Sequence, residues 1–474
     1  MLYPVIPANI AITQQSTVLK TGLFCLFCLI LFILPLPLGS NRPWAWSLSQ
    51  SYIFILTFLC ISFYWQEFSS AFRAHKPVVI CLVVVTAYLF LQQIPLPVEL
   101  LEILSPNTVK YLPSDAGFGH LSFDRHATAS AMLKLASYLC IFCIALFFLN
   151  TPEKIQQALL FMVITGAVQG FYGAFEVLSG QDKTAFFDFM VNPRANGSFV
   201  YHNHFANFLM LCLCAGMGYF ITSLSRRQYR YKSDRLKATL FALTDTKTMV
   251  RIMLMIMVIA LVMSRSRMGN TAFFSSFLIV SLIYFFRGKS VPGGFKILVV
   301  SMLIIDTFIV SAWFGLDKVK ERIEGTSIEA ESRDEVYRDA MKIVEDFPLT
   351  GTGGGSFETI FSSYQSEDIK LFYDHAHNDY IQFMVEYGIP VTGLLGAMMA
   401  YVIYLAAKVL VTRQRRQLTG PAAAALMAFI GMLIHMSVDF PLLPPANASF
   451  LMVFIAIACN ISKMEIAPRR KRRH

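Results

Sequence analysis

The sequence has few charged residues for its length. Asp, Glu, Lys and Arg make up only 15% of its 474 residues, whereas hydrophobic residues make up 55% and the mean hydropathy is +0.55. Soluble domains carry about 25% charged residues, so this composition excludes an ordinary soluble protein. Apolar runs long enough to cross a hydrocarbon core recur along the chain. The sequence therefore predicts an all-α polytopic membrane protein, with residues 1–474 forming a single integral membrane domain.

Twelve apolar segments have the length of membrane-spanning helices. They are 21–38, 48–65, 77–96, 130–149, 155–178, 203–224, 249–264, 269–286, 296–315, 380–411, 420–440 and 445–463. The first segment lacks a small-residue cleavage pattern. It is therefore expected to remain as a helix rather than to be removed as a signal peptide.

The chain also lacks the cysteine spacing of a disulfide framework or a zinc site. All nine cysteines fall in apolar spans, where cysteine behaves as a small hydrophobic residue. Cys25 and Cys28 have CxxC spacing but no histidine or cysteine partner nearby, and no HExxH-type spacing occurs. Neither disulfides nor a metal site is predicted.

Lys and Arg lie mostly in alternate loops, and positive loops stay in the cytoplasm. If the N-terminus is inside, the cytoplasmic segments take the larger share of these residues, including RRQYRYKSDRLK at 226–237 and the terminal RRKRRH. Both termini are therefore predicted to be cytoplasmic. The net charge of +10 is explained by topology and by contact with anionic membrane lipid, so no nucleic-acid partner is inferred.

One long insertion, residues 316–378, separates the ninth and tenth segments and is predicted to lie outside the membrane on the opposite side from the termini. Within it, Ser332 and Glu335 match a capping box at the start of a helix. An apolar stripe at helical spacing follows, formed by Val336, Ala340, Ile343, Val344 and Phe347. The insertion is therefore expected to carry an amphipathic helix on the outer membrane face.

The flanks of this helix carry polar residues. Arg333, Tyr337 and Arg338 lie away from the apolar stripe. Pro348 and the sequence GTGGG are expected to end the helix in a turn. A phosphate-binding loop is not indicated, because the GK[ST] ending and a preceding strand are both missing.

Polar residues gather at three places that the predicted topology puts on one side. Arg265 and Arg267 stand in SRSRMGN at the end of the seventh span, and a charge at membrane depth usually faces a cavity or a partner. The sixth span opens with His202, Asn203, His204 and Asn207. Interfacial anchoring of the two arginines is the alternative interpretation.

The third place is the stretch DHAHNDYIQFMVEYG, residues 374–388. His375, His377, Asn378 and Asp379 lead into a polar face that continues through Gln382 and Glu386. A metal site is disfavoured, because alternate residues near a helix start seldom point at one ion. A structural role for either histidine alone is the alternative, and it weakens when both stand beside carboxylates and near arginines.

These motifs resemble one bacterial family. RDEVYRDAMKIVEDFPLTGTGGGSFE followed by HAHNDYIQFMVEYG is similar to the hallmark region of the O-antigen ligase family, which includes O-antigen polymerases and protein O-oligosaccharyltransferases. SRSR and GSFVYHNHFANFL resemble earlier landmarks of the family, so the motif-bearing region covers 197–393.

The resemblance also implies roles for individual residues. It implies that His377 is the catalytic histidine, and that Arg265 and Arg267 lie near a lipid-linked diphosphate. Arg333 matches the arginine that opens the loop helix. The resemblance does not fix His375. Supporting roles are expected for His375, Asn378, Asp379, Arg338, His202 and Asn203.

Histidine and arginine suit this chemistry. A glycan on a polyprenyl diphosphate is already activated, so transfer needs a base for the acceptor hydroxyl and cations for the departing diphosphate. Histidine can take a proton near neutral pH, and the arginine fork grips phosphate oxygens in place of a metal ion. An inverting displacement without metal or cofactor follows. Asp379 and Glu386 are both candidates to orient the imidazole.

We therefore expect a glycosyltransferase of the bacterial inner membrane, acting at the periplasmic face in lipopolysaccharide biosynthesis. Its expected substrates are an undecaprenyl-diphosphate-linked glycan as donor and lipid A–core as acceptor. One departure keeps alternatives open: the ligase-type pattern has G-x-x-G-T-G where this chain has GIPVTG, with Val391 at the second glycine. The alternatives are a polysaccharide polymerase and a protein O-oligosaccharyltransferase.

A transporter is the alternative from a different class. It would predict internal repeats with polar sites near the membrane midplane. No repeat is evident between the two halves, and the polar residues stand at one rim and in one long loop.

Overall fold

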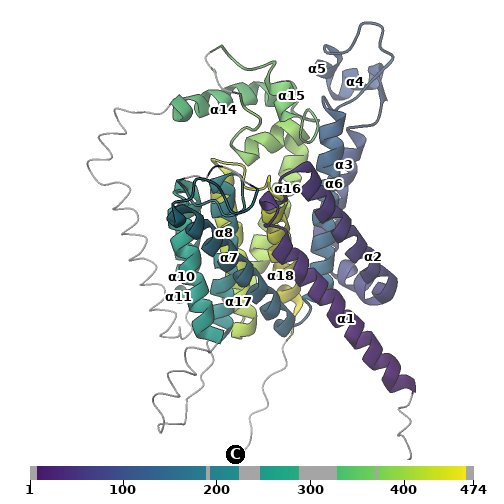
Figure 1. Ribbon diagram of the computed structural model, residues 1–474. Coiled ribbons are helices and arrows are strands. Elements are labelled where there is room, and N and C mark those ends of the chain that lie inside the picture. Colours follow the sequence, from purple (N-terminus) through teal and green to yellow (C-terminus); the bar gives the residue numbers. More distant parts are fainter. Residues whose placement is uncertain are drawn as a thin grey trace, which may run out of the picture.

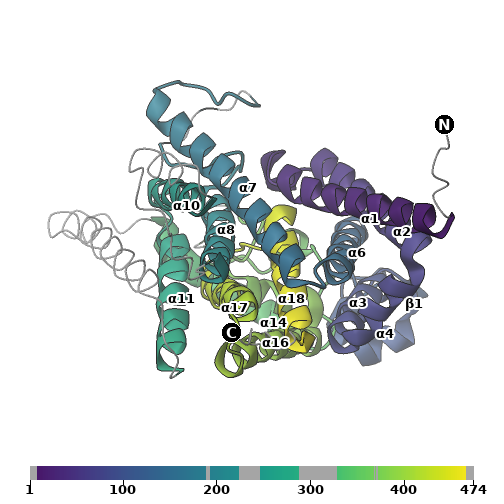
Figure 2. The ribbon, with the colours of Figure 1, turned by 90° about the horizontal axis from the view of Figure 1, so that it is seen from below.

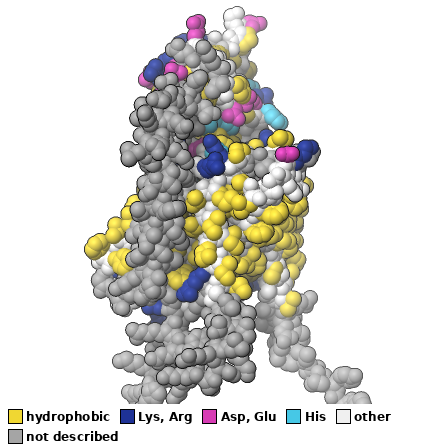
Figure 3. All heavy atoms as spheres, turned by 60° about the vertical axis from the view of Figure 1, so that its left-hand side comes forward, with side chains coloured by type: hydrophobic (Ala, Val, Ile, Leu, Met, Phe, Trp, Pro, Cys, Tyr) yellow, Lys and Arg dark blue, Asp and Glu magenta, His cyan; other side chains and the backbone are white. Residues whose placement is uncertain are grey.

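The computed structural model describes residues 8–187, 190, 193–223, 246–287, 328–367, 369 and 372–465. Within these residues the chain is a bundle of helices that run largely along one direction, with shorter elements at one end (Figures 1 and 2). Apolar side chains form a band around the face seen in Figure 3, and charged and histidine side chains gather above it. This distribution fits a multi-pass membrane protein.

Eight helices are long and apolar enough to cross a membrane. They are α2 (Pro43–Ala74), α6 (Arg125–Phe148), α7 (Pro152–Ser179), α8 (His202–Ser223), α11 (Arg267–Phe286), α16 (Asp379–Thr412), α17 (Arg416–Met436) and α18 (Pro445–Lys463). Three further helices have shorter apolar stretches: α1 (Ala8–Ile33), α3 (Lys76–Leu91) and α10 (Thr246–Met263).

These helices coincide with all the predicted spans except the ninth. Residues 296–315 lie outside the described residues, so the total of twelve spans stays a prediction. Boundaries differ at several ends. The eleventh predicted span ran to residue 440, whereas α17 ends at Met436 and leaves Asp439 in the following loop.

The centre of the bundle is formed by α8, α17 and α18, whose side chains are almost all buried. Small residues allow α8 and α17 to approach closely. A Cβ added at Gly218 would lie 2.5 Å from the Ala424 Cβ and 2.8 Å from the Gly420 carbonyl oxygen. Such close backbone contact is how helices associate in lipid, where apolar burial alone gives little driving force.

Several short elements stand at one end of the bundle, and the sequence did not predict all of them. They are η1 (Leu38–Ser40), β1 (Leu96–Pro97), α4 (Val98–Leu104), α5 (Pro106–Val109), β2 (Phe118–Gly119) and α15 (Phe357–Phe361). The two strands pair antiparallel, with Leu96 opposite Gly119. We call this end, where α8, α11 and α16 begin, the site end.

The predicted amphipathic helix is α14 (Ile328–Asp346). Its apolar stripe is buried as expected, and it packs with Phe357 and Phe361 of α15 and with Val385 of α16. The predicted start was wrong, since the helix begins at Ile328 rather than after a cap at Ser332. Glutamate and alanine in the preceding IEAE stretch are good helix formers and extend it upstream. The helix ends before Pro348, as predicted.

Helix α16 is broken near its start. Gly388 has φ 76° and ψ 166°, and Pro390 follows it. Another segment of the chain packs closely against the helix at this break. A Cβ at Gly388 would lie 2.5 Å from the Leu349 carbonyl oxygen and 3.0 Å from the Gly351 nitrogen. The kink therefore makes room for the glycine-rich turn that follows α14.

Candidate active site

His377 is the last residue but one before α16. Asn378 caps this helix, because its Oδ1 accepts hydrogen bonds from the backbone nitrogens of Tyr380 (3.0 Å) and Ile381 (3.2 Å). The Asn378 amide also donates to the Ser437 carbonyl at 2.9 Å. These bonds tie the segment carrying His377 to the end of α17.

The backbone at His377 is strained. Its φ of 51° lies in the left-handed region, which costs energy for a non-glycine residue. The Tyr337 hydroxyl of α14 donates to the His377 carbonyl at 2.9 Å and helps to hold this conformation. Arg265, with φ 52°, is another of the few non-glycine residues with positive φ in the described part of the chain. Such strain clusters at functional sites.

Aromatic rings surround Phe440, in the loop between α17 and α18. His375 stacks on Phe440 with ring centroids 4.6 Å apart, and His377 meets it edge-on at 4.7 Å. His204 is edge-on at 4.9 Å, and Tyr201 is stacked at 5.9 Å. We call these five residues and Asp439 the histidine cluster. It joins segments from the starts of α8 and α16 and the end of α17.

Asp439 is the carboxylate of this cluster. Its Oδ1 lies 3.8 Å from the His377 Nδ1, and its Oδ2 accepts a hydrogen bond from the Asn203 amide. Its side chain is 2% exposed. Burial would raise the pKa of Asp439, but the facing His377 imidazole and the nearby His435 and His204 lower it to about 2. An ionised carboxylate therefore faces one nitrogen of His377.

Neither carboxylate considered from the sequence takes this place. Asp379 Oδ2 accepts from the Leu442 nitrogen at 3.3 Å. Glu386 accepts from the Gly355 nitrogen at 2.8 Å and from the Gln382 amide at 3.0 Å. Sequence reasoning missed Asp439 because it was counted within a span. A lone carboxylate in or beside an apolar segment is costly unless it is paired. The presence of Asp439 there could therefore have indicated a buried partner.

The supporting residues fall into different surroundings. His375 pairs with Asp374, Nδ1 to Oδ1 at 3.0 Å, and this contact lowers the pKa of Asp374. His202 is bonded to the Arg194 guanidinium at 3.0 Å. Arg338 is exposed on α14. Of the predicted supporting residues, His375 belongs to the cluster itself, and Asn203 is linked to the cluster through Asp439.

Arg265 lies in the turn between α10 and α11, Arg267 is the first residue of α11, and both are exposed. Ser266 caps α11 by accepting a hydrogen bond from the Gly269 nitrogen at 3.1 Å. This turn contacts the segment leading into α8, because the Ala195 nitrogen donates to the Met263 carbonyl at 3.0 Å. Both arginines are therefore at the site end, although outside the histidine cluster. Arg333 belongs to α14, and its side chain lies outside the described part of the structure.

A second buried polar network surrounds the sequence GTGGG, residues 351–355, which we call the glycine turn. The Thr352 nitrogen donates to the Val385 carbonyl at 2.8 Å, and the Gly354 nitrogen donates to Gln92 Oε1 at 3.2 Å. The Gly353 and Gly355 nitrogens donate to the Glu386 carbonyl and carboxylate. These backbone amides already donate hydrogen bonds to other groups of the protein, so the turn has a structural role. This agrees with the absence of a phosphate-loop motif in the sequence.

Together these features define a class: a multi-pass membrane protein with a strained histidine, an ionised carboxylate and arginines at one end of its helix bundle. Residues 252–396 match the family model described as O-Antigen ligase. This match supports the O-antigen ligase family, which the motifs of the chain predicted. No curated protein matches the chain.

The family match contains Arg265, Arg267, Arg333 and His377, whereas Asn203 and Asp439 lie outside it. It supports a membrane enzyme of the O-antigen ligase or polymerase type that acts on glycans. Within the described residues, no group of three or more His, Cys, Asp or Glu side chains is arranged to hold a metal ion. The metal-independent mechanism stays a prediction.

Proposed function

We propose that this protein is a glycosyltransferase of the inner membrane that transfers an undecaprenyl-diphosphate-linked glycan to lipid A–core at the periplasmic face. One observation carries the proposal. His377 has a strained backbone and faces the buried, ionised Asp439, while its own side chain keeps 18% exposure. A histidine held rigidly beside an anion and open to solvent has the properties of a general base.

The two imidazole nitrogens have different tasks in the proposed reaction. Nδ1 faces Asp439, which favours the tautomer with the proton on Nδ1 and the lone pair on Nε2. Nε2 of His377 then takes the proton of the acceptor hydroxyl. The acceptor oxygen forms a bond to the anomeric carbon, and the bond from that carbon to the diphosphate oxygen breaks with its electron pair. A single displacement of this kind inverts the anomeric centre.

The arginines receive the charge of the departing diphosphate. Arg265 and Arg267 are exposed at the site end, and the resemblance adds Arg333. The arginine guanidinium stays charged and binds two phosphate oxygens at once, so it supports a diphosphate leaving group without a metal ion. Asn378, by capping α16, and Asn203, by binding Asp439, hold the base in place.

A polymerase that joins glycan repeat units is the second candidate, because the GIPVTG sequence departs from the ligase-type pattern at Val391. Val391, in α16, is partly buried and packs against the apolar core. The same base and arginines serve either reaction, since only the acceptor differs. Protein O-glycosylation is the third candidate within the family.

Deletion of the gene followed by inspection of surface glycans tests the proposal. A ligase predicts free lipid A–core together with accumulated lipid-linked polymer. Core carrying a single repeat unit would instead assign the polymerase reaction, and normal glycans with an unglycosylated protein would assign the third. Alkaline phosphatase fused near Gly354 tests the sidedness: activity is expected, and an inactive fusion would move the site out of the periplasm.

A further inference from the structure

One buried histidine next to Asp439 has no part in the proposed reaction. His435 is the last residue but one of α17, and its side chain is 0% exposed. Its Nε2 lies 4.0 Å from Asp439 Oδ2, whereas His377 Nδ1 lies 3.8 Å from Oδ1 of the same carboxylate. Asp439 therefore stands between two imidazoles, of which His377 is partly exposed and His435 is enclosed by the protein.

Each carboxylate oxygen of Asp439 accepts one hydrogen bond and faces one imidazole. Oδ1 accepts from the Phe440 nitrogen at 2.9 Å, and Oδ2 accepts from the Asn203 amide. A carboxylate oxygen can accept two hydrogen bonds, so each one has room for an imidazole N–H as well. Such contacts are often longer in a free enzyme than in its substrate complex. His435 can therefore hold Oδ2 while His377 uses Oδ1.

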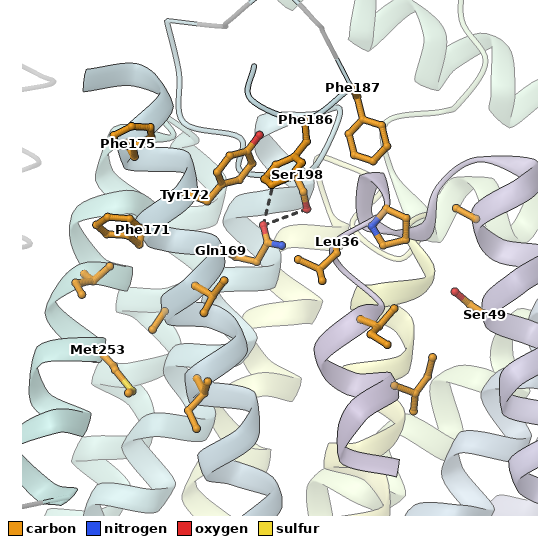
Figure 4. Close-up of a pocket in the computed structure, with 18 of the residues that line it drawn as sticks. Leu36, Ser49, Gln169, Phe171, Tyr172, Phe175, Phe186, Phe187, Ser198 and Met253 are labelled. Atoms are coloured by element: carbon orange, nitrogen blue, oxygen red, sulfur yellow. Dashed lines mark hydrogen bonds between the residues drawn. The ribbon is translucent and has the colours of Figure 1, made fainter. Parts of the chain in front are cut away.

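The segment that carries Asn203 is itself held in place. Ser198 precedes it in the same segment and lies beside an apolar cavity between α1, α2, α7 and α10 (Figure 4). The Ser198 nitrogen and hydroxyl both donate to Gln169 Oε1 of α7 at 3.1 Å, as the dashed lines in Figure 4 show. Oδ2 of Asp439 thus has one fixed partner from α8, and His435 provides a second from α17.

The partner of the other His435 nitrogen fits this role. Nδ1 of His435 lies 3.2 Å from Oδ1 of Asn207, a buried residue of α8. This amide suits Nδ1 in either protonation state. Its oxygen accepts from an N–H, and after half a turn its nitrogen, which makes no hydrogen bond within the described residues, donates to a bare nitrogen. Nε2 can therefore carry a proton directed at Asp439, as a favourable contact with a carboxylate requires.

The burial of His435 also calls for a partner. Its Nε2 makes no hydrogen bond in the described part of the chain, and a buried polar nitrogen without a partner costs stability. A phenylalanine in this apolar interior would avoid that cost. The attraction between His435 and the Asp439 carboxylate offsets it. Burial raises the pKa of Asp439, but the facing His377 and then His435 lower it to about 2, so the carboxylate is charged.

We propose that His435 is a positioning residue for the reaction: its Nε2–H holds the Asp439 carboxylate in the orientation that aligns His377. The inference rests on the proposed function for the role of His377 as base. His435 acts through Asp439 and moves no proton to or from the acceptor. Without His435, Asn203 would hold Oδ2 with no help from α17, and the carboxylate could rotate away from His377 Nδ1.

A double-mutant cycle between His435 and Asp439 in the purified full-length protein tests the inference. His435→Phe should lower kcat for glycan transfer about tenfold, the loss that follows removal of an outer partner of a metal-bound histidine, with KM for the lipid-linked donor unchanged. In an Asp439→Asn background the same change should lower kcat no further, because no carboxylate is left to hold. His435→Gln should keep most of the rate, since its amide can still donate to Oδ2.

His75→Phe is the matched control. His75 is also buried, and its Nε2 lies 3.2 Å from Asn460 Oδ1, but this pair lies toward the opposite end of α18 from Asp439. Its replacement should leave kcat per folded molecule unchanged. If His435→Phe does not fold, Asn207→Leu enters the same cycle with the same coupling expected, because it has a similar shape and removes the partner of Nδ1.

Melting temperatures of the same variants measure the contact without any substrate. His435→Phe should lower the melting temperature of the wild type but not that of Asp439→Asn. Additive effects of the two changes in either measurement, or a His435→Gln rate as low as that of His435→Phe, would overturn the inference. Coupled melting temperatures in a protein that transfers no glycan would instead refute the proposed function alone.

Discussion

The histidine cluster and the glycine turn both bury polar groups at the site end, but they satisfy them differently. In the glycine turn, Gln92 and Glu386 together bind the backbone nitrogens of Gly353, Gly354 and Gly355. In the histidine cluster, buried nitrogens such as His377 Nδ1 and His204 Nε2 make no hydrogen bond within the described structure. One network is complete and the other is not.

This difference indicates that the glycine turn has a structural role and the histidine cluster a chemical one. A buried polar network whose members are all bonded fixes one conformation, because breaking any bond leaves a costly unpaired group. A cluster with buried imidazole nitrogens that lack a hydrogen bond and with a strained backbone carries a cost in stability, and such costs are typical of functional sites. The comparison predicts that changes in the cluster reduce catalysis, whereas changes in the glycine turn reduce stability.

The largest effect is expected at His377. His377→Gln should lower the rate of glycan transfer by about 10²–10⁴-fold, the usual contribution of a general base, without lowering the melting temperature. Steady-state transfer by purified protein with a lipid-linked donor measures it. His126→Gln is the control, since His126 is an exposed histidine at the start of α6. Wild-type transfer by His377→Gln would reduce the cluster to a structural role.

The two arginines should follow closely. Replacing both Arg265 and Arg267 by Ala is expected to lower transfer by about 10²–10³-fold, as removal of charge stabilisation at a leaving group does. Lysine at both positions should restore only part of the rate, because a point charge lacks the two-point grip on phosphate. Arg42→Ala, exposed before α2, controls for loss of any surface charge. Full activity of a folded double alanine variant would exclude the arginines from the reaction.

A comparison of Asp439→Asn with Glu386→Gln tests the difference between the histidine cluster and the glycine turn directly. Loss of the charge facing His377 should lower kcat about 10–100-fold, equivalent to about 1.5–3 kcal/mol, with little change in KM for the donor. Glu386→Gln keeps an acceptor oxygen for the Gly355 nitrogen and should keep kcat. Parallel losses of kcat in both variants would mean that the two networks do not differ in function.

Within the glycine turn, Gly353→Ala should destabilise the protein by about 1–3 kcal/mol. Gly353 has φ 108°, and an added Cβ would lie 2.6 Å from the Ser122 Oγ. Thermal unfolding in detergent should show a lower melting temperature, while activity per folded molecule stays unchanged. Gly393→Ala, where an added Cβ meets nothing within 4 Å, is the matched control and should not destabilise.

The smallest effect is a pH dependence of stability. The pKa of Asp439 is lowered from its usual 3.8 to about 2 in the folded protein. Its ionised form therefore contributes stability that is present above about pH 4 and is lost as the pH falls toward 2, amounting to about 2 kcal/mol. Melting temperatures compared at about pH 6 and pH 3 should fall less in Asp439→Asn than in wild type. An equal fall in melting temperature between about pH 6 and pH 3 in the two proteins would show that the Asp439 carboxylate does not stabilise the fold.

Local features of this structure could be predicted from the sequence, and the network around His377 could not. Hydropathy and helical spacing depend on neighbouring residues, so the apolar spans, the buried stripe of α14 and the polar start of α16 followed from them. Asp439 and Phe440 reach His377 only through the packing of α16 against α17 and α18, which no local pattern encodes. The same holds for Gln92, which contacts the glycine turn from the end of α3.

Donor binding and transfer by His377→Ala test the central claim most directly. The purified variant should bind the undecaprenyl-diphosphate-linked glycan as tightly as wild type, because the arginines hold the diphosphate, and should transfer none of it to the acceptor. Imidazole added to the solution should restore part of the rate by replacing the missing base. Transfer at the wild-type rate without imidazole would contradict the assignment of His377 as the base.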